Sequence, residues 1–81
     1  MNVRVKLFAV ARDIVGREET ILSLPENSTT SSAVQLIVQQ YPKLEQWRKY
    51  LRIAVNWEYV STDQALHNND EVAVIPPVSG G

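Results

Sequence analysis

Apolar side chains recur at every second position in four stretches of this chain, which is the period of a β-strand with one buried face. The stretches are residues 3–8, 20–24, 51–55 and 71–75, with inward side chains predicted at Val3, Val5, Leu7, Leu22, Leu24, Val55, Val72 and Val74. Tyr59 and Val60 are predicted to form a shorter strand after a tight reversal at residues 56–58. A second turn is predicted at residues 68–70, where Asn68 or Asn69 can take a positive φ.

Two other stretches have helical spacing. Residues 10–15 predict a short helix that ends at Gly16, and residues 31–40 predict a longer helix that Pro42 prevents from continuing. Between the longer helix and the next strand, residues 43–50 are expected to form one irregular turn that packs Trp47 onto the core. Hydroxyl residues near the start of the longer helix are interpreted as capping residues, since no base is placed to make them nucleophiles: Ser28, Thr29, Ser31 and Ser32.

The order of these elements predicts an α+β fold of the β-grasp, ubiquitin-like type. About five strands would form a mixed sheet wrapped on one main helix, with the first and last strands as parallel central neighbours. A ferredoxin-like plait is the alternative, but it needs a second long helix, and residues 61–70 lack the periodicity for one. We expect a domain over residues 1–75 and an extended tail over residues 76–81.

The same strand alternation predicts an apolar patch on the outward face of the sheet. It would contain Phe8, Ala54, Tyr59, Ala73 and Ile75, where a one-sided sheet is normally polar. Such a patch indicates a surface for a protein partner. The alternative is that the small helix or the tail covers Phe8 and Tyr59. Trp57, at a loop tip, either touches a partner or covers the sheet edge.

The last residues predict a projecting C-terminus. Pro76 and Pro77 remove two backbone donors and should end the last strand at Ile75. The residues after Ile75 could carry a terminal carboxylate about 20 Å from the domain, at roughly 3.3 Å per extended residue. The two final glycines would let it enter a narrow channel. The alternative is a frayed terminus without a role. The segment consists of Pro76, Pro77, Val78, Ser79, Gly80 and Gly81.

Composition excludes several classes of partner and of functional site. The 81 residues are 44% hydrophobic and 21% charged with a net charge of -1, which is typical of a globular protein and argues against nucleic-acid or membrane partners. There is no cysteine, so any sulfur must come from another molecule. His67 has no second histidine at metal-ligand spacing, so no metal site is predicted. Without a signal or transit segment, the mature chain is expected in the cytoplasm, or as a processed form in an equivalent reducing compartment.

Several segments together carry a family resemblance over nearly the whole chain. They are Phe8-Ala9 with a short helix ending in Val15-Gly16, Ala54-Val55-Asn56 with Glu58-Tyr59-Val60, Asp70-Glu71-Val72-Ala73, and Ile75-Pro76-Pro77-Val78-Ser79-Gly80-Gly81. With these segments the chain resembles the small subunit of molybdopterin synthase. The ending Pro-Pro-Val-Ser-Gly-Gly is far more specific than Gly-Gly alone. Asn69 departs from the glycine usual in that family, but asparagine tolerates the same left-handed conformation.

The resemblance implies a ubiquitin-like sulfur carrier, a protein-bound cosubstrate more than an enzyme. A ubiquitin-activating-type adenylyltransferase and sulfurtransferase would consume ATP to adenylate Gly81, and sulfur would then replace one carboxyl oxygen. The resulting thiocarboxylate would enter the large synthase subunit, in a heterotetramer, and donate sulfur to cyclic pyranopterin monophosphate. Gly80 would provide a slim approach, and Phe8, Tyr59, Ile75 and residues 76–79 would contact the partner. The resemblance implies no bound cofactor in this chain.

Two other functions fit the same features. A ubiquitin-like modifier would be joined to target lysines through Gly81 without sulfur transfer, and a sulfur carrier could instead serve thiamine synthesis or tRNA thiolation. The specific Pro-Pro-Val-Ser ending argues against a carrier for thiamine synthesis or tRNA thiolation.

Overall fold

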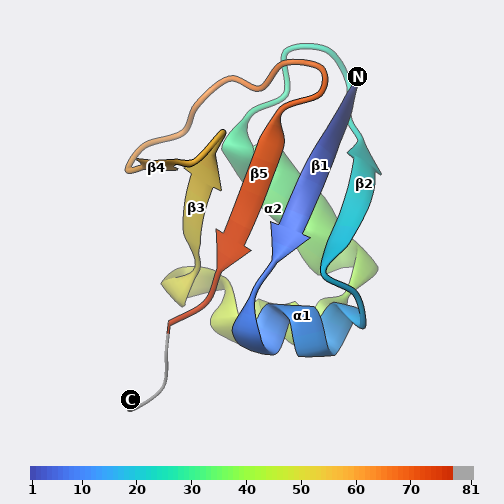
Figure 1. Cartoon of the computed structure of the whole chain (residues 1–81), viewed down its shortest axis with the longest axis vertical. Coiled ribbons are helices and arrows are strands. Elements are labelled where there is room, and N and C mark those ends of the chain that lie inside the picture. The colour runs from blue at the N-terminus through green and yellow to red at the C-terminus, as the bar shows by residue number, and fades with distance from the viewer. Residues whose placement is uncertain (78–81) are drawn as a thin grey trace.

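The computed structural model describes residues 1–77, and five of its segments form one mixed sheet in the order β2-β1-β5-β3-β4 (Figure 1). β1 and β5 are parallel neighbours at its centre, with Val5 opposite Val72, and the other adjacent strands are antiparallel. The predicted β-grasp topology is therefore confirmed. The strands are β1 (Asn2–Leu7), β2 (Glu19–Ser23), β3 (Arg52–Val55), β4 (Glu58–Val60) and β5 (Glu71–Ile75).

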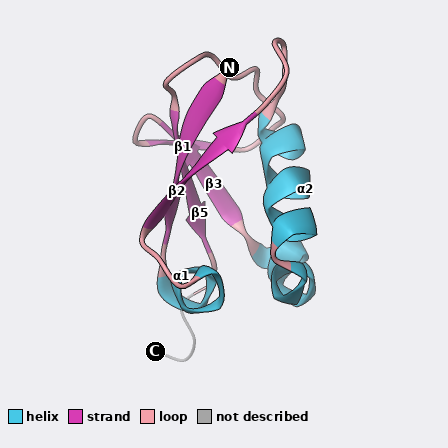
Figure 2. Ribbon diagram, turned by 90° about the vertical axis from the view of Figure 1, so that its right-hand side faces the viewer, coloured by secondary structure: helices cyan, strands magenta, loops and turns pink. Residues whose placement is uncertain are grey.

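One long helix covers one face of this sheet. Figure 2 shows α2 (Thr30–Gln40) alongside the sheet and the short α1 (Ala9–Val15) across one end of it. Burying the inward strand residues against α2 removes their apolar surface from water, which is the main contribution to the stability of such a domain. The core contains the predicted inward residues together with Ala11, Ala33, Ile37, Val38, Leu44 and Leu66.

Local sequence signals account for the ends of both helices. Gly16 has φ 85°, the left-handed conformation that commonly closes a helix, and its N–H donates to the carbonyl of Arg12. Thr29 caps α2 and exchanges hydrogen bonds with Ser32 in a capping box. The predicted helix and its cap are therefore confirmed, with the helix beginning one residue earlier, at Thr30.

The segment after α2 differs from its prediction. It is a 3₁₀ helix, η1 (Pro42–Tyr50), and its fully buried residue is Leu44, whereas Trp47 is only half-buried and lies outside the core. Leu44, Trp47 and Tyr50 are three residues apart, so they lie along one ridge of a 3₁₀ helix. Their exposure increases along that ridge to 61% at Tyr50. The helix therefore leads outward from the core, and its first apolar residue takes the place predicted for Trp47.

The residues that follow β5 also differ in part from the expectation. β5 ends at Ile75, as the two prolines predict, but Pro76 is fully buried and Pro77 is the first exposed residue. The packed body thus includes Pro76, one residue beyond the predicted boundary. Within residues 1–77, no helix is both long and apolar enough to cross a membrane.

Candidate partner-binding face

The face of the sheet opposite α2 carries the predicted apolar patch. Phe8 is 43% exposed and Tyr59 is 66% exposed, so neither α1 nor the described part of the tail covers them. Trp57, at the tip of the β3–β4 hairpin, is 81% exposed. The expected exposure of Phe8 and Tyr59 is confirmed, and their role in an interface stays a prediction.

Two small members of the patch contribute less surface than expected. Ala54 is opposite Ala73 on one side and Tyr59 on the other, which places it on the outward face, yet it is only 6% exposed. Its methyl group is short and lies beside the much larger Tyr59 on the adjacent strand. Ala73 and Ile75 are half-buried. Ala54 therefore forms part of the floor of the patch and offers little contact area.

Phe8 is held at the junction between β1 and α1. Its N–H donates to the carbonyl of Val74 at 3.3 Å, and its carbonyl accepts from the N–H groups of Ala11 and Arg12 at 3.1 and 3.4 Å. Its backbone is extended, and Ala9 follows with φ 51°. Because its backbone is bonded to both β5 and α1, Phe8 is fixed next to the strand that leads to the C-terminus.

The β3–β4 turn places Trp57 in an unfavourable conformation. Asn56 and Trp57 have φ 50° and 74°, and positive φ at both central residues defines a type I′ turn. Glycine is preferred at the second of these positions, and a left-handed conformation costs an ordinary residue about 1–2 kcal/mol. The predicted reversal is correct, but it is closed by Asn-Trp in place of the usual Asn-Gly.

Hydrogen bonds fix this turn to the start of β5. The N–H of Asn56 donates to the carbonyl of Glu71 at 2.8 Å, and the N–H of Glu71 donates to Oδ1 of Asn56 at 3.0 Å. Nδ2 of Asn56 donates to Oδ1 of Asp70 at 3.0 Å. Partial burial raises the pKa of Asp70, but hydrogen bonds from Asn56 and His67, together with the charge of His67, outweigh it and lower that pKa below 3.8. A carboxylate therefore stabilises the turn.

A nearly buried carboxylate lies on the outward face beside this turn. The side chain of Glu71 is 10% exposed, and its Oε1 lies 3.6 Å from Nη1 of Arg4 and 3.7 Å from Nζ of Lys6. The same Lys6 Nζ lies 5.7 Å from the ring centre of Trp57, within the range of a cation–π interaction. Lys6 thus links the carboxylate to the tryptophan.

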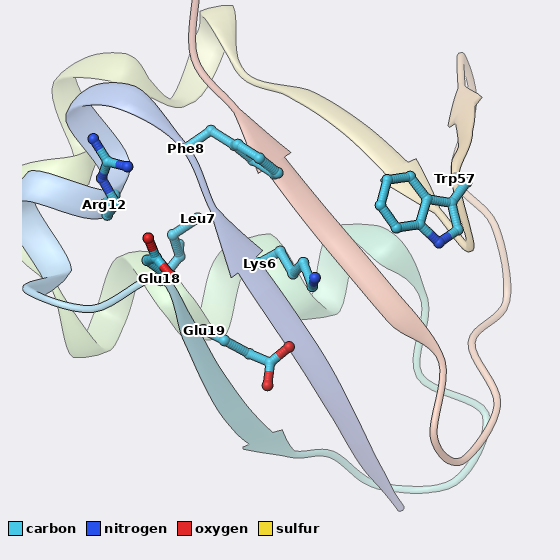
Figure 3. A pocket seen from close by; sticks show the side chains of 7 residues that line it. All are labelled: Lys6, Leu7, Phe8, Arg12, Glu18, Glu19 and Trp57. Carbon is cyan, nitrogen blue, oxygen red and sulfur yellow. The ribbon is translucent and has the colours of Figure 1, made fainter.

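These side chains border two adjoining hollows. A groove of about 290 Å³ is lined by Lys6, Phe8, Ala54, Trp57, Tyr59, Glu71, Ala73 and Ile75. A second, more polar hollow of about 450 Å³ is lined by Lys6, Leu7, Phe8, Arg12, Glu18, Glu19 and Trp57 (Figure 3). Lys6, Phe8 and Trp57 line both. We call the first hollow the outer groove.

The remaining predicted site residues are placed as follows. Ile75 lines the outer groove, and Pro77 is exposed, whereas the buried Pro76 offers no free surface in this chain. Val78, Ser79, Gly80 and Gly81 lie outside the described residues. His67 is exposed, with Nδ1 3.8 Å from Oδ2 of Asp70. Within residues 1–77, no three histidine or acidic side chains are grouped to hold a metal ion.

Sequence reasoning missed Lys6 and Glu71 as site residues and left Trp57 undecided. The alternation does assign Lys6 to the outward face. Glu71 comes next to Lys6 only through pairing between distant strands, because Arg4 lies opposite Glu71 in the parallel β1–β5 ladder. For Trp57 the sequence did offer a signal: a tryptophan follows Asn56 where the turn normally has glycine.

Three comparisons place this geometry among known proteins. The ThiS family model matches residues 5–81. The molybdopterin synthase sulfur carrier subunit of Arabidopsis thaliana is 37% identical over 81 residues, covering 100% of this chain and 84% of that protein.

Among solved structures, SAMP1 from Haloferax volcanii superposes with a TM-score of 0.88 at 26% identity, covering 100% of both chains. A chain from the protein–protein complex of subunits 1 and 2 of the molybdopterin-converting factor of Helicobacter pylori has a TM-score of 0.69 at 23% identity, again over 100% of both chains, and supports the fold alone. With the family model matching nearly its full length, and a β-grasp body whose outward face carries no helix within residues 1–77, this chain belongs to the ThiS family.

Proposed function

We propose that this chain is the sulfur-carrier small subunit of a molybdopterin synthase. The observation that carries the proposal is the 37% identity to a molybdopterin synthase sulfur carrier subunit over all 81 residues of this chain. The family match extends through the Gly-Gly ending to residue 81, which supports a role for the terminus as well as for the folded body.

The chemistry would take place at the terminal carboxyl group of Gly81. A carboxylate with a pKa near 3.5 is ionised at neutral pH and is a poor electrophile. Adenylation with ATP by an activating enzyme releases pyrophosphate and makes AMP the leaving group on the terminal carbonyl carbon. Hydrosulfide then displaces AMP to leave a thiocarboxylate, or a persulfide displaces AMP and a second thiol cleaves the resulting S–S bond to release the same thiocarboxylate. Since this chain has no cysteine, the sulfur comes from another protein or small molecule. The thiocarboxylate then donates its sulfur to cyclic pyranopterin monophosphate.

The partner in that step would be the large synthase subunit. The exposed Phe8 and Tyr59 lie beside Ile75, the last residue of β5, so a protein that binds the outward face also meets the start of the tail. The relative from Arabidopsis thaliana, 37% identical, is named as a subunit of molybdopterin synthase, which supports an assembly with a further subunit. We extend the proposal to a heterotetramer of two small and two large subunits.

Deletion of Gly81 tests the proposed function. In a system reconstituted with the activating enzyme, the large subunit and the pyranopterin precursor, the truncated chain should fold normally and transfer no sulfur. Intact mass spectrometry should show an oxygen-to-sulfur exchange on the full-length chain alone. Product formation by the truncated chain would refute the assignment.

A ubiquitin-like modifier is the second candidate function. It is favoured by the TM-score of 0.88 to SAMP1, which is a small archaeal modifier protein. A modifier would appear in cell extracts as a series of larger conjugates joined through Gly81, whereas a sulfur carrier would keep its own mass apart from the exchanged atom. Conjugates that form while no sulfur exchange is detected would favour the modifier.

A further inference from the structure

Trp57 occupies a position that its own backbone disfavours. It has φ 74° in a type I′ turn that prefers glycine there, and its side chain remains 81% exposed. Its ring meets Lys6 at 5.7 Å, but so exposed a ring gains little from packing within the chain. Exposed strain of this kind indicates a contact made outside the folded body.

The turn also holds the indole ready for such a contact. Three hydrogen bonds join Asn56 to Asp70 and Glu71, so the backbone that carries Trp57 is fixed to β5. A rigid aromatic side chain loses little conformational entropy on binding, and tryptophan is among the residues that most often dominate binding energy. The ring is therefore suited to be a preformed anchor.

The outer groove beside Trp57 limits what can enter. Its volume of about 290 Å³ lies just below the roughly 300–1,000 Å³ typical of small-molecule pockets. Its walls are the aromatic rings of Phe8, Trp57 and Tyr59, and its floor is largely apolar. An apolar side chain inserted by a protein fits this shape better than a cofactor does.

The net charge of the outward face indicates which type of residue lies next to that inserted side chain on the partner. Strand pairing puts Arg4, Lys6 and Arg52 on the outward face against two carboxylates, Glu19 and Glu71, so this face carries +1 while the whole chain carries -1. Glu71 is bound by both Arg4 and Lys6. Lys6 can therefore turn to an incoming carboxylate while Arg4 keeps Glu71 paired.

We propose that Trp57 is an affinity-determining anchor for the large subunit, and that the outer groove receives an apolar side chain which that subunit presents next to a carboxylate. The inference deepens the proposed function and rests on it. The same groove is lined by Ile75, where β5 ends, so one partner surface would meet Trp57 and the start of the tail together.

Trp57→Gly tests the anchor, because its effects on folding and on binding are opposite in sign. The variant creates the Asn-Gly pair preferred in type I′ turns, so its urea midpoint should equal or exceed that of the wild type. Its Kd for the large subunit, measured by calorimetry, should rise about tenfold or more. Tyr50→Ala is the control, since it removes another exposed aromatic ring, 61% exposed, that lines neither hollow.

Lys6→Gln tests the acidic neighbour. If Lys6 meets a partner carboxylate, the Kd of the wild-type chain should rise more steeply with salt concentration than the Kd of the variant. Equal salt dependence overturns the acidic part of the proposal.

The failures of the two proposals are distinguishable. A Trp57→Gly chain that binds as tightly as the wild type overturns this inference alone, because sulfur transfer by the wild type can be measured separately. A wild-type chain that does not bind the large subunit overturns the partner assignment and this inference together. If Tyr50→Ala weakens binding as much as Trp57→Gly does, the inference about Trp57 is also overturned.

Discussion

At the scale of single residues, the outward face depends on side chains whose backbones are fixed while their rings remain exposed. Phe8 is bonded through its backbone to Val74 on one side and to the first turn of α1 on the other. Asn69 has φ 70°, the left-handed conformation expected of a residue that stands where the resembled family usually has glycine. Folding thus specifies where Phe8 points, and its exposed ring adds little to stability.

Phe8→Ala should separate binding from folding. With 43% of Phe8 exposed, truncation removes few core contacts, so the melting temperature should change by only a few degrees. If Phe8 contacts the large subunit, the Kd should rise about tenfold or more. Calorimetric titration and a thermal melt measure the two quantities on the same sample. An unchanged Kd would remove Phe8 from the interface.

At the scale of elements, the crossover between β4 and β5 serves as the cap of α2. Oδ1 of Asp63 accepts from the N–H of Ser31 at 2.8 Å and from the hydroxyl of Thr30 at 2.9 Å. Thr30 in turn exchanges hydrogen bonds with the backbone of Gln64, and Thr29 pairs with Ala65. A carboxylate at a helix N-terminus also interacts favourably with the helix dipole. The irregular crossover is therefore ordered by the helix that it caps.

Asp63 makes the stability of this contact depend on pH. The backbone N–H of Ser31, assisted by hydroxyl groups of the same turn, lowers the pKa of Asp63 from 3.8 to about 2. A lowered folded-state pKa means that the carboxylate stabilises the fold fully above pH 3.8, and that this contribution is lost as the pH falls from 3.8 to about 2.

Asp63→Ala should consequently be less stable than the wild type at neutral pH, and the difference should become smaller as the pH falls from 3.8 to about 2. Urea unfolding at a series of pH values measures the difference. Asp63→Asn keeps an oxygen acceptor but cannot titrate, so its difference from the wild type should shrink over the same range. A difference that stays constant with pH would show that Asp63 acts without its charge.

At the scale of the whole molecule, one small core supports the entire outward face. The helix η1 packs against both α1 and α2, and its Leu44 is fully buried. A domain of this size has a free energy of unfolding of roughly 5–15 kcal/mol, so a single core position can account for a large part of it.

Leu44→Ala should lower the free energy of unfolding by about 2–5 kcal/mol, through lost burial and the cavity left behind. Tyr50→Ala, in the same helix but 61% exposed, should change it by less than about 0.5 kcal/mol. Chemical denaturation of the three proteins provides the comparison. Similar effects for the two variants would mean that η1 does not contribute to the core.

The sequence by itself determined the strands, the inward side chains, the ends of both helices, the stop at Ile75 and the outward position of Phe8 and Tyr59. These features follow from local rules, since strand period, glycine conformation and proline chemistry act within a few residues. Tertiary structure alone decided that Leu44 replaces Trp47 in the core and that Pro76 is buried. It also brought Glu71 between Arg4 and Lys6, and Lys6 beneath Trp57, because those contacts depend on how strands distant in the chain pair with one another.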